Sequence, residues 1–596
     1  MDDQDHDLGP NDQYQDLGPN YQNQYLGPND QDQDNPLNST VESKPPPMTD
    51  VFFDYLDLVQ AIEAIPNGSS PGPDGIPTVM LKRAKVPIAR MLYCLFRTSI
   101  DKGHIPDDLK HDFVIPVHKG GSRLLPEEYR PISLTSHLMK SGERVIRKYL
   151  VGYLEMYKKF DPNQHGSRNQ RSTLSQLLVH HDEIVKALEN GDNIDVIYLD
   201  FKKAFDKVDH GILLQKLRKL GISGKIGRWI HNFLKQRQNQ VLVKGKKSRI
   251  FPLISGVPQG SVLGPLLFLL FIGDISEGVG ASTLLYVDDS KVKQTVNNED
   301  EVEHLQEDLD KIYKWQRMNN MEFNSKKFLV MRYGKNSTLK QDTEYFTGEM
   351  ETVIEQVENC KDLGVILSDD ATFEHQIDKV TKKARQKGGW IMRTFYSREQ
   401  HFMRHMYNTL VQPHLDYCVQ LWAPPEGPQM DKIEDYTKKI PFVREKNYWE
   451  RLKILKMNSE QRRIERYKIL YTWKVLQNKM PNPGISTLPY NEIRGRKCYI
   501  PFTRNKKRLE TFQISGSKPF NCLPEELRNI TTGSEDEFKT KLDAFLGKIP
   551  DEPRCPGLTP GATDMLESRP TNSLQYQIQR AWRERLPCGW MNQLAS

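Results

Sequence analysis

Three aspartates stand at the ends of two short apolar runs. Asp200 follows the run at 196–199, and Asp288 and Asp289 follow the run at 284–287. Both runs are rich in β-branched and aromatic residues, which is typical of buried strands. If the two strands are neighbours in one sheet, their ends bring the carboxylates together, where like charges repel one another unless cations are present. The pattern therefore predicts a site for divalent metal ions.

Two divalent ions held by a few carboxylates suit nucleotidyl transfer. One ion activates an attacking 3′-hydroxyl, and the other steadies the leaving pyrophosphate. Mg²⁺ prefers a few carboxylates together with substrate phosphates, and we expect it here, with Mn²⁺ as an alternative. Other Asp pairs at 107–108 and 369–370 follow polar or turn-like residues typical of solvated loops, so an Asp pair alone does not mark such a site.

A glycine-containing segment, 256–261 (GVPQGS), lies between the two runs. Its glycines, Gly256 and Gly260, permit close approach of the backbone to a ligand. The side-chain amide of Gln259 can donate a hydrogen bond. We expect Gln259 to act near the sugar of a nucleotide or near a template strand.

Seven motifs in this chain resemble, in the same order, those of reverse transcriptases from non-LTR retrotransposons of the jockey and chicken-repeat type. They cover residues 70–77, 129–135, 198–206, 256–265, 286–289, 324–327 and 363–365. Residues 413–417 with Trp422, and residues 462–467, resemble the family more loosely. The resemblance implies an α+β right-hand polymerase, with fingers, a palm containing an antiparallel sheet, a helical thumb and a helical C-terminal extension.

The resemblance also implies an activity and its partners. The chain is expected to be an RNA-directed DNA polymerase, which adds dNTPs to the 3′-hydroxyl of a DNA primer on an RNA template. Asp200 and Asp288 would be the principal metal ligands, Asp289 would support them, and the Phe201 carbonyl would complete one coordination shell.

Further residues are expected to contact the nucleotide. By resemblance, Lys119 and Arg130 reach the triphosphate, for which a point charge and a bidentate fork are suited. Phe205 would close the pocket below the sugar and exclude a ribose 2′-hydroxyl, and Lys327 would contact phosphate. The alternatives are a solvated turn lysine at 119, a core aromatic at 205 and a surface lysine at 327.

The charge distribution suits a polyanionic partner. The net charge is +6, but residues 1–50 hold 11 acidic residues and only Lys44 as a base, so the rest has 83 Lys and Arg against 67 Asp and Glu, or +16. Phosphate contacts carry much of nucleic-acid affinity.

Arg462, Arg463 and Arg466 lie among aromatic residues on an expected helix, which favours RNA binding. A solvated basic face explains the same pattern.

The chain divides by composition into five expected regions. Residues 1–50 contain Leu-Gly-Pro-Asn at 8–11, 17–20 and 26–29, and this polar repeat is expected to be disordered. Fingers and palm are expected over 51–370 with a core at about 98–367, a thumb-like region over 371–425, a basic extension over 426–550 and a loosely structured tail over 551–596. Such elements usually carry an endonuclease ahead of the polymerase, and we expect none in this chain.

Cysteine spacing and apolar runs indicate the compartment. The seven cysteines are dispersed without zinc-type spacing, as in a reduced intracellular protein. The longest apolar run, 262–272, is too short to span a bilayer, and the acidic start is unlike a signal peptide. We expect a protein of the cytoplasm, the nucleus or both, with no membrane partner. The sequence does not indicate an oligomeric state.

Two other functions compete with this interpretation. The chain could be a catalytically inactive, nucleic-acid-binding remnant of a truncated element, although Asp200, Asp288 and Asp289 are intact. It could also be an RNA-templated RNA polymerase, which shares the palm. Phe205 at the position of the sugar gate argues against the latter.

Overall fold

The computed structural model describes residues 45–348, 352–424, 428–434, 448–489, 495–548 and 551. Most of the repeat segment and all of the tail after Asp551 lie outside these residues. The chain forms two compact units: one runs to Asp161 and includes Phe205–Ile272, and the other comprises Pro162–Ala204 and the chain from Gly273 onward. Both combine helices with largely antiparallel sheets, so the predicted α+β class is confirmed.

The first unit is built around a sheet of order β2-β1-β4-β5, with β6 paired to β4. Its strands are β1 (His111–His118), β2 (Tyr129–Leu134), β4 (Arg237–Val243), β5 (Lys246–Lys247) and β6 (Phe251–Leu253). Its α-helices are α1 (Tyr55–Glu63), α2 (Thr78–Arg83), α3 (Lys85–Lys102), α4 (His137–Met156), α6 (His210–Lys219), α7 (Gly224–Leu234) and α8 (Gly264–Ile272). Short 3₁₀ turns are η1 (Asp107–Lys110), η2 (Pro126–Glu128) and η3 (Ala204–Asp206). Every residue of α8 is buried, which explains its uninterrupted apolar sequence.

The second unit contains a five-stranded sheet of order β12-β9-β3-β8-β7. The strands are β3 (Ile194–Leu199), β7 (Ser282–Tyr286), β8 (Asp289–Thr295), β9 (Leu329–Tyr333) and β12 (Glu355–Gln356). Both apolar runs of the sequence are strands, as predicted, and β3 lies between two neighbours because it is apolar on both faces. Smaller strands follow: β10 (Phe346–Thr347), β11 (Thr352–Val353), β13 (Asn359–Asp362) and β14 (Val365–Ser368).

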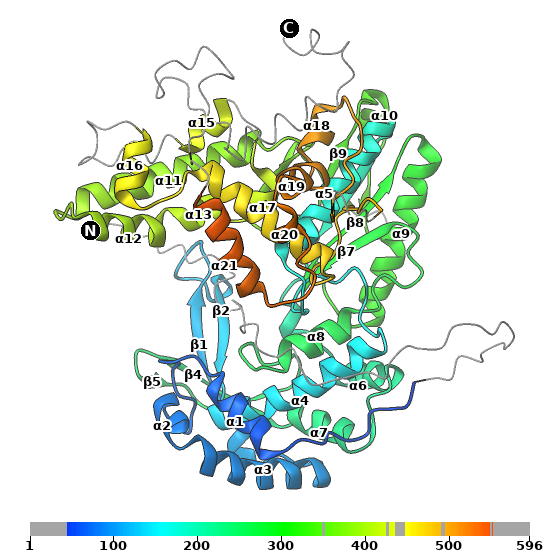
Figure 1. The fold of residues 1–596 in the computed structure, drawn as a ribbon. Helices are drawn as coiled ribbons and strands as arrows, with labels where there is room; N and C mark the ends of the chain where they lie inside the picture. Colours follow the sequence, from blue (N-terminus) through cyan, green and yellow to red (C-terminus); the bar gives the residue numbers. More distant parts are fainter. Residues whose placement is uncertain are drawn as a thin grey trace, which may run out of the picture. The chain divides into compact units, whose positions relative to one another are not determined.

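Helices cover this sheet. α5 (Thr173–Asn190) contacts β3 and β7, and α9 (Glu299–Met318) contacts β8 (Figure 1). Short helices η4 (Ser325–Lys327) and α10 (Ser337–Asp342) flank β9. The C-terminal helices are α11 (Glu374–Thr394), α12 (Gln400–Leu410), α13 (Gln412–Asp416), α14 (Val419–Trp422), α15 (Pro428–Glu434), α16 (Tyr448–Leu455), α17 (Glu460–Leu476), α18 (Lys506–Glu510), α19 (Phe512–Asn521), α20 (Glu525–Arg528) and α21 (Glu535–Leu546).

One hydrophobic core joins the sheet to these C-terminal helices. It contains Val196 of β3 and Met331 of β9 together with Trp422 and Trp473, each at most 1 % exposed. The core therefore continues across residue 370, where the sequence predicted a domain boundary. Over the described ranges, no helix combines the length and the apolar character needed to cross a bilayer.

Candidate active site

The carboxyl-bearing turn between β7 and β8 is a tight hairpin. Tyr286 pairs with Asp289, so only Val287 and Asp288 form the connection. Val287 has φ of +59°, in the left-handed region that β-branched residues avoid. Such strain persists only where the surroundings hold it, and it is concentrated at functional sites.

The third aspartate lies beside this hairpin. β3 runs antiparallel to β8 with Leu199 opposite Ser290, so the next step of the register sets Asp200 beside Asp289. The structure thus brings the ends of the two predicted strands together, and with them the three aspartates.

Like charges dominate the surroundings of Asp289. Although the residue is exposed, protein atoms crowd its carboxylate, and this desolvation raises its pKa to about 7, with further contributions from the charges of Asp288, Asp362 and Asp200. The Lys291 ammonium acts in the opposite direction, and it is buried in an ion pair with Asp362. At neutral pH the site is therefore a place where added positive charge is favourable.

Asp200 is held by the turn around η4. The Asn324 side-chain amide donates to Asp200 Oδ2 at 3.1 Å, and the Lys327 ammonium lies 3.1 Å from the same oxygen. Lys327 is 65 % exposed, so this pair is a surface ion pair of small strength. The lysine for which the sequence predicted a phosphate contact therefore contacts a carboxylate here.

The donor set fits a hard cation with few protein ligands. Across the ranges that the structure covers, no three His, Cys, Asp or Glu side chains form a ready metal cage. Mg²⁺ does not need one, because it keeps waters and substrate phosphates as ligands. After β3, the Lys202 amide donates to the Glu322 carbonyl and the Asn324 amide donates to the Asp200 carbonyl. The Phe201 carbonyl takes no part in these two hydrogen bonds. Oxygen donors and excess negative charge both suit Mg²⁺ or Mn²⁺.

A short segment that the sequence did not single out supports the strained turn. The Gln164 side-chain oxygen accepts hydrogen bonds from the amides of Val287, at 3.0 Å, and Gly166, at 2.8 Å. Gln164 is buried, and a Cβ on Gly166 would lie 2.5 Å from the Val287 amide nitrogen. In the sequence, this support is visible only as a Gln and a Gly two positions apart. Such a pair does not indicate a functional site by itself.

Four predicted nucleotide contacts lie in the first unit. Lys119 follows β1, and Arg130 on β2 pairs with Val117, so the two residues share one face of the β1–β2 hairpin. Both are exposed. Their charges are therefore available to an anionic ligand, and neither is needed for packing.

The loop at 256–261 docks on the segment that contains Phe205. The Phe205 carbonyl accepts from the Val257 amide at 2.8 Å, and the Gln259 side-chain amide donates to Asp206 at 2.9 Å. Gly256 has φ of +84°, and a Cβ there would lie 2.7 Å from the Phe205 carbonyl oxygen. The glycine is thus required by close backbone packing, and Gln259 is held in a fixed orientation.

Phe205 has a packing partner and a half-buried ring. It stacks on Phe268 of α8, with centroids 4.6 Å apart and an interplanar angle of 17°. This contact is the one expected if Phe205 is a core residue. A role in closing the sugar pocket would involve the part of the ring that is exposed.

Glu143 lies outside the motifs found in the sequence, and its role in the structure was not predicted. It is buried on α4 and accepts from the Val262 and Leu263 amides at 2.7 and 2.9 Å, just before α8 begins. Burial raises the pKa of its carboxyl. It anchors the far end of the loop that carries Gln259, a long-range contact that leaves no motif in the sequence.

The three arginines predicted to bind RNA lie on α17 among acidic partners. Arg463 contacts Asp416 at 2.6 Å, and Arg466 contacts Asp543 at 2.5 Å. Arg462 is buried, 3.8 Å from Asp551. Arg462 is thus buried, whereas Arg463 and Arg466 are partly exposed and are paired with carboxylates of other helices. Their contact with nucleic acid remains a prediction.

Residues 117–367 match the protein family described as "Reverse transcriptase (RNA-dependent DNA polymerase)". The matched segment holds β3, the β7–β8 hairpin and the three aspartates. This part of the chain therefore belongs to the reverse transcriptase family, with its right-hand polymerase fold, as the motifs predicted.

The chain is also similar to polymerases of mobile elements. It is 28 % identical over 381 residues to the probable RNA-directed DNA polymerase from transposon BS of Drosophila melanogaster, covering 62 % of this chain and 42 % of that protein. It is 28 % identical over 392 residues to the RNA-directed DNA polymerase from mobile element jockey of the same species, covering 63 % and 42 %. The Pol polyprotein from retrotransposable element R2 of Popillia japonica is 29 % identical over 201 residues, which cover 34 % of this chain and 27 % of that protein. The matched region thus spans less than half of each of these relatives.

Proposed function

We propose that this chain is an RNA-directed DNA polymerase of a non-LTR retrotransposon. A primer 3′-hydroxyl attacks the α-phosphate of a dNTP that is paired with an RNA template, a new phosphodiester bond forms and pyrophosphate leaves. The observation that carries the proposal is the placement of Asp200 beside Asp289, at the end of the β3–β8 pair and next to a strained turn that contains Asp288.

The carboxylates would hold the divalent cation. Asp200, Asp288 and the Phe201 carbonyl are its proposed ligands, and Asp289 adds negative charge beside them. When bound, Mg²⁺ or Mn²⁺ supplies charge that activates the hydroxyl and stabilises the leaving pyrophosphate. Lys327 would then release Asp200 and become available to a phosphate, because a surface ion pair is readily exchanged.

The nucleotide contacts complete the proposal. Arg130 and Lys119 bind the triphosphate, Phe205 lies below the sugar, and Gln259, oriented by Asp206, lies close to it. All four of these residues belong to the first unit. The similarity of the chain to the jockey and BS polymerases supports RNA as the template and DNA as the product.

Primer extension tests the proposal. The full chain is incubated with a DNA primer annealed to an RNA template, dNTPs and Mg²⁺, and product length is measured with and without EDTA. We expect metal-dependent extension from dNTPs. Binding of the template–primer without any extension in Mg²⁺ or Mn²⁺ would overturn the proposal and favour the inactive remnant. Asp107→Asn with Asp108→Asn is the matched control, because it removes an exposed Asp pair. Asp107 is paired with the buried Lys110, so a melting curve checks that this variant is folded.

A further inference from the structure

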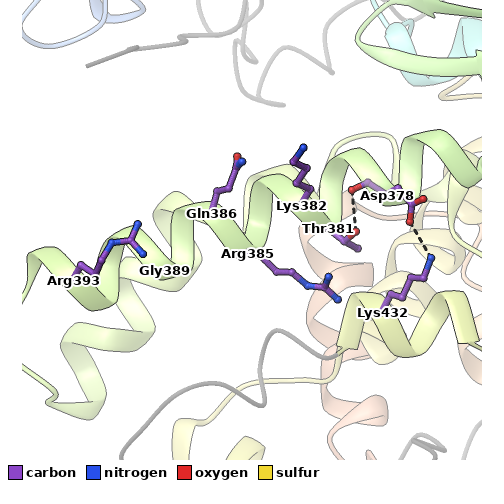
Figure 2. A pocket seen from close by; sticks show the side chains of 8 residues that line it. All are labelled: Asp378, Thr381, Lys382, Arg385, Gln386, Gly389, Arg393 and Lys432. Carbon is purple, nitrogen blue, oxygen red and sulfur yellow. Dashed lines mark hydrogen bonds and ion pairs between the residues drawn. The ribbon is translucent and has the colours of Figure 1, made fainter. Parts of the chain in front are cut away.

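α11 carries an open basic groove along the side that faces α15. The groove has a volume of about 610 Å³, and Figure 2 shows Arg385 projecting from α11 toward α15, on which Lys432 stands. Its lining residues are Asp378, Thr381, Lys382, Arg385, Gln386, Gly389, Arg393 and Lys432. Four of them are cations and one is an anion, so the groove has a net charge of +3.

The one acidic residue of the groove compensates little of this charge. Asp378 lies 2.9 Å from Lys432, but the two side chains are 63 % and 48 % exposed, and pairs of this kind contribute little. The remaining cations, Lys382, Arg385 and Arg393, are exposed. The groove therefore suits an anionic ligand.

The spacing of the groove suits a chain of phosphates. Arg385, Gly389 and Arg393 are four residues apart, so they share one helix face. Eight residues correspond to about 12 Å along the helix, which is long enough to meet more than one phosphate of a nucleic-acid strand. Between the two arginines, the Arg393 guanidinium lies over Gly389, where a Cβ would be 3.2 Å from its Nη1. Both arginines thus present their charge along the same side of α11.

Two exposed aromatic residues stand three positions before and three positions after Arg393 in the sequence. Trp390 is 43 % exposed and is braced by Phe395, with ring centroids 5.7 Å apart. Tyr396, two residues past the end of α11, is 97 % exposed. Aromatic rings beside a positive groove are the elements that bind single strands, because every base can stack on a ring and the cations hold the phosphates. A duplex hides its base faces and cannot use the rings in this way.

We propose that the α11–α15 groove, together with Trp390 and Tyr396, binds a single-stranded nucleic acid. The phosphates lie along Lys382, Arg385 and Arg393, and one or two bases stack on the aromatic rings. The inference rests on the proposed function, in which the chain handles nucleic acid. It goes beyond the thumb-like role that the resemblance implies for 371–425, because that role concerns the template–primer duplex.

Fluorescence anisotropy of labelled oligonucleotides tests this site. Oligouridine, oligodeoxythymidine and a blunt RNA duplex are titrated with the full chain and with a Trp390→Ala, Tyr396→Ala double variant. We expect the variant to lose about tenfold or more in affinity for the single strands and to bind the duplex within about twofold of the parent. Loss for both single strands, or for RNA alone, supports the site and tells which strand it prefers.

Matched variants separate stacking from general effects. Phe502→Ala removes another exposed aromatic residue of the same unit and should leave affinity unchanged, whereas Trp390→Phe keeps a ring and should retain most of it. Arg385→Gln with Arg393→Gln should flatten the salt dependence of binding more than Lys539→Gln with Lys541→Gln, which removes the same charge from α21. Melting curves check that each variant is folded.

Three results would overturn the site. These are unchanged single-strand affinity in the double aromatic variant, an equal loss for the duplex, or equal salt slopes for the two charge variants. Primer extension is measured on the same preparations. If the parent extends primers and the aromatic variant still binds single strands normally, only this inference is refuted. If the parent binds single strands but never extends a primer, only the proposed function is refuted.

Discussion

The end of the β3–β8 pair and the helix α17 both concentrate charge, but in opposite ways. Around Asp289, desolvation together with the charges of three other carboxylates raises its pKa to about 7. On α17, Arg463 and Arg466 each contact a carboxylate, and these contacts hold separate helices together. Charged groups that are surrounded by like charges are stabilised by a ligand of the opposite charge. Charged groups that already contact oppositely charged side chains are neutralised within the fold. Both clusters are equally visible in the sequence.

Removal of one metal-binding carboxylate should have the largest effect. Asp200→Asn and Asp288→Asn should each lower primer extension by roughly a hundredfold or more, because each removes a charged ligand and leaves the packing nearly unchanged. Extension rates are compared with those of the Asp107→Asn, Asp108→Asn control. A variant that extends at the parental rate would place the chemistry elsewhere.

Truncation of Phe205 should separate two roles of one residue. If the ring closes the sugar pocket, Phe205→Ala should raise the ratio of rNTP to dNTP incorporation. If the ring only packs on Phe268, the variant should lose about 3 kcal/mol of stability, as large-to-small core changes do, with an unchanged ratio. Incorporation kinetics and a melting curve are measured together, and the second pair of results would remove the gate from the account.

Removal of an α17 arginine should affect stability and leave chemistry intact. Arg463→Ala leaves Asp416 and the buried Glu460 without its charge, and we expect a loss of about 3 kcal/mol in the free energy of unfolding. Extension per folded molecule should stay close to that of the parent. A stable variant whose affinity for an RNA–DNA hybrid falls, with a smaller salt slope, would instead support the nucleic-acid role predicted from the sequence.

The smallest effect expected is a pH dependence of metal binding. The pKa of Asp289 is raised from 3.8 to about 7, so below pH 7 its carboxyl retains a proton that a cation must displace. Affinity for Mg²⁺ should therefore fall about tenfold between pH 8 and pH 6. Asp289→Asn should flatten this dependence. A dependence that persists in this variant would assign the titration to another group.

Much of the site could be predicted because its signals are local. The strands before Asp200 and Asp288 are visible as apolar runs, and an Asp at the end of a strand is readable without a structure. The supports of the site were not predicted, because Gln164 meets Val287 across more than a hundred residues, and Glu143 meets Val262 across a similar separation. Neither contact leaves a periodic pattern.

The arginines of α17 show a second limit. Basic and aromatic residues that alternate on a helix look the same whether the helix faces RNA, water or acidic partners. The acids that contact Arg463 and Arg466 lie on α13 and α21, far away in sequence. On α11, by contrast, Lys382, Arg385 and Arg393 are exposed and line a groove.

Binding of Mn²⁺, followed by electron paramagnetic resonance, tests most directly the claim that crowded carboxylates form the metal site. The parent chain and the Asp200→Asn, Asp288→Asn double variant are titrated with Mn²⁺ at pH 8, and the Asp107→Asn, Asp108→Asn variant serves as the control for charge. We expect saturable binding by the parent and the control, and its loss in the Asp200/Asp288 variant. Equal Mn²⁺ binding by all three proteins would show that these carboxylates do not form the metal site.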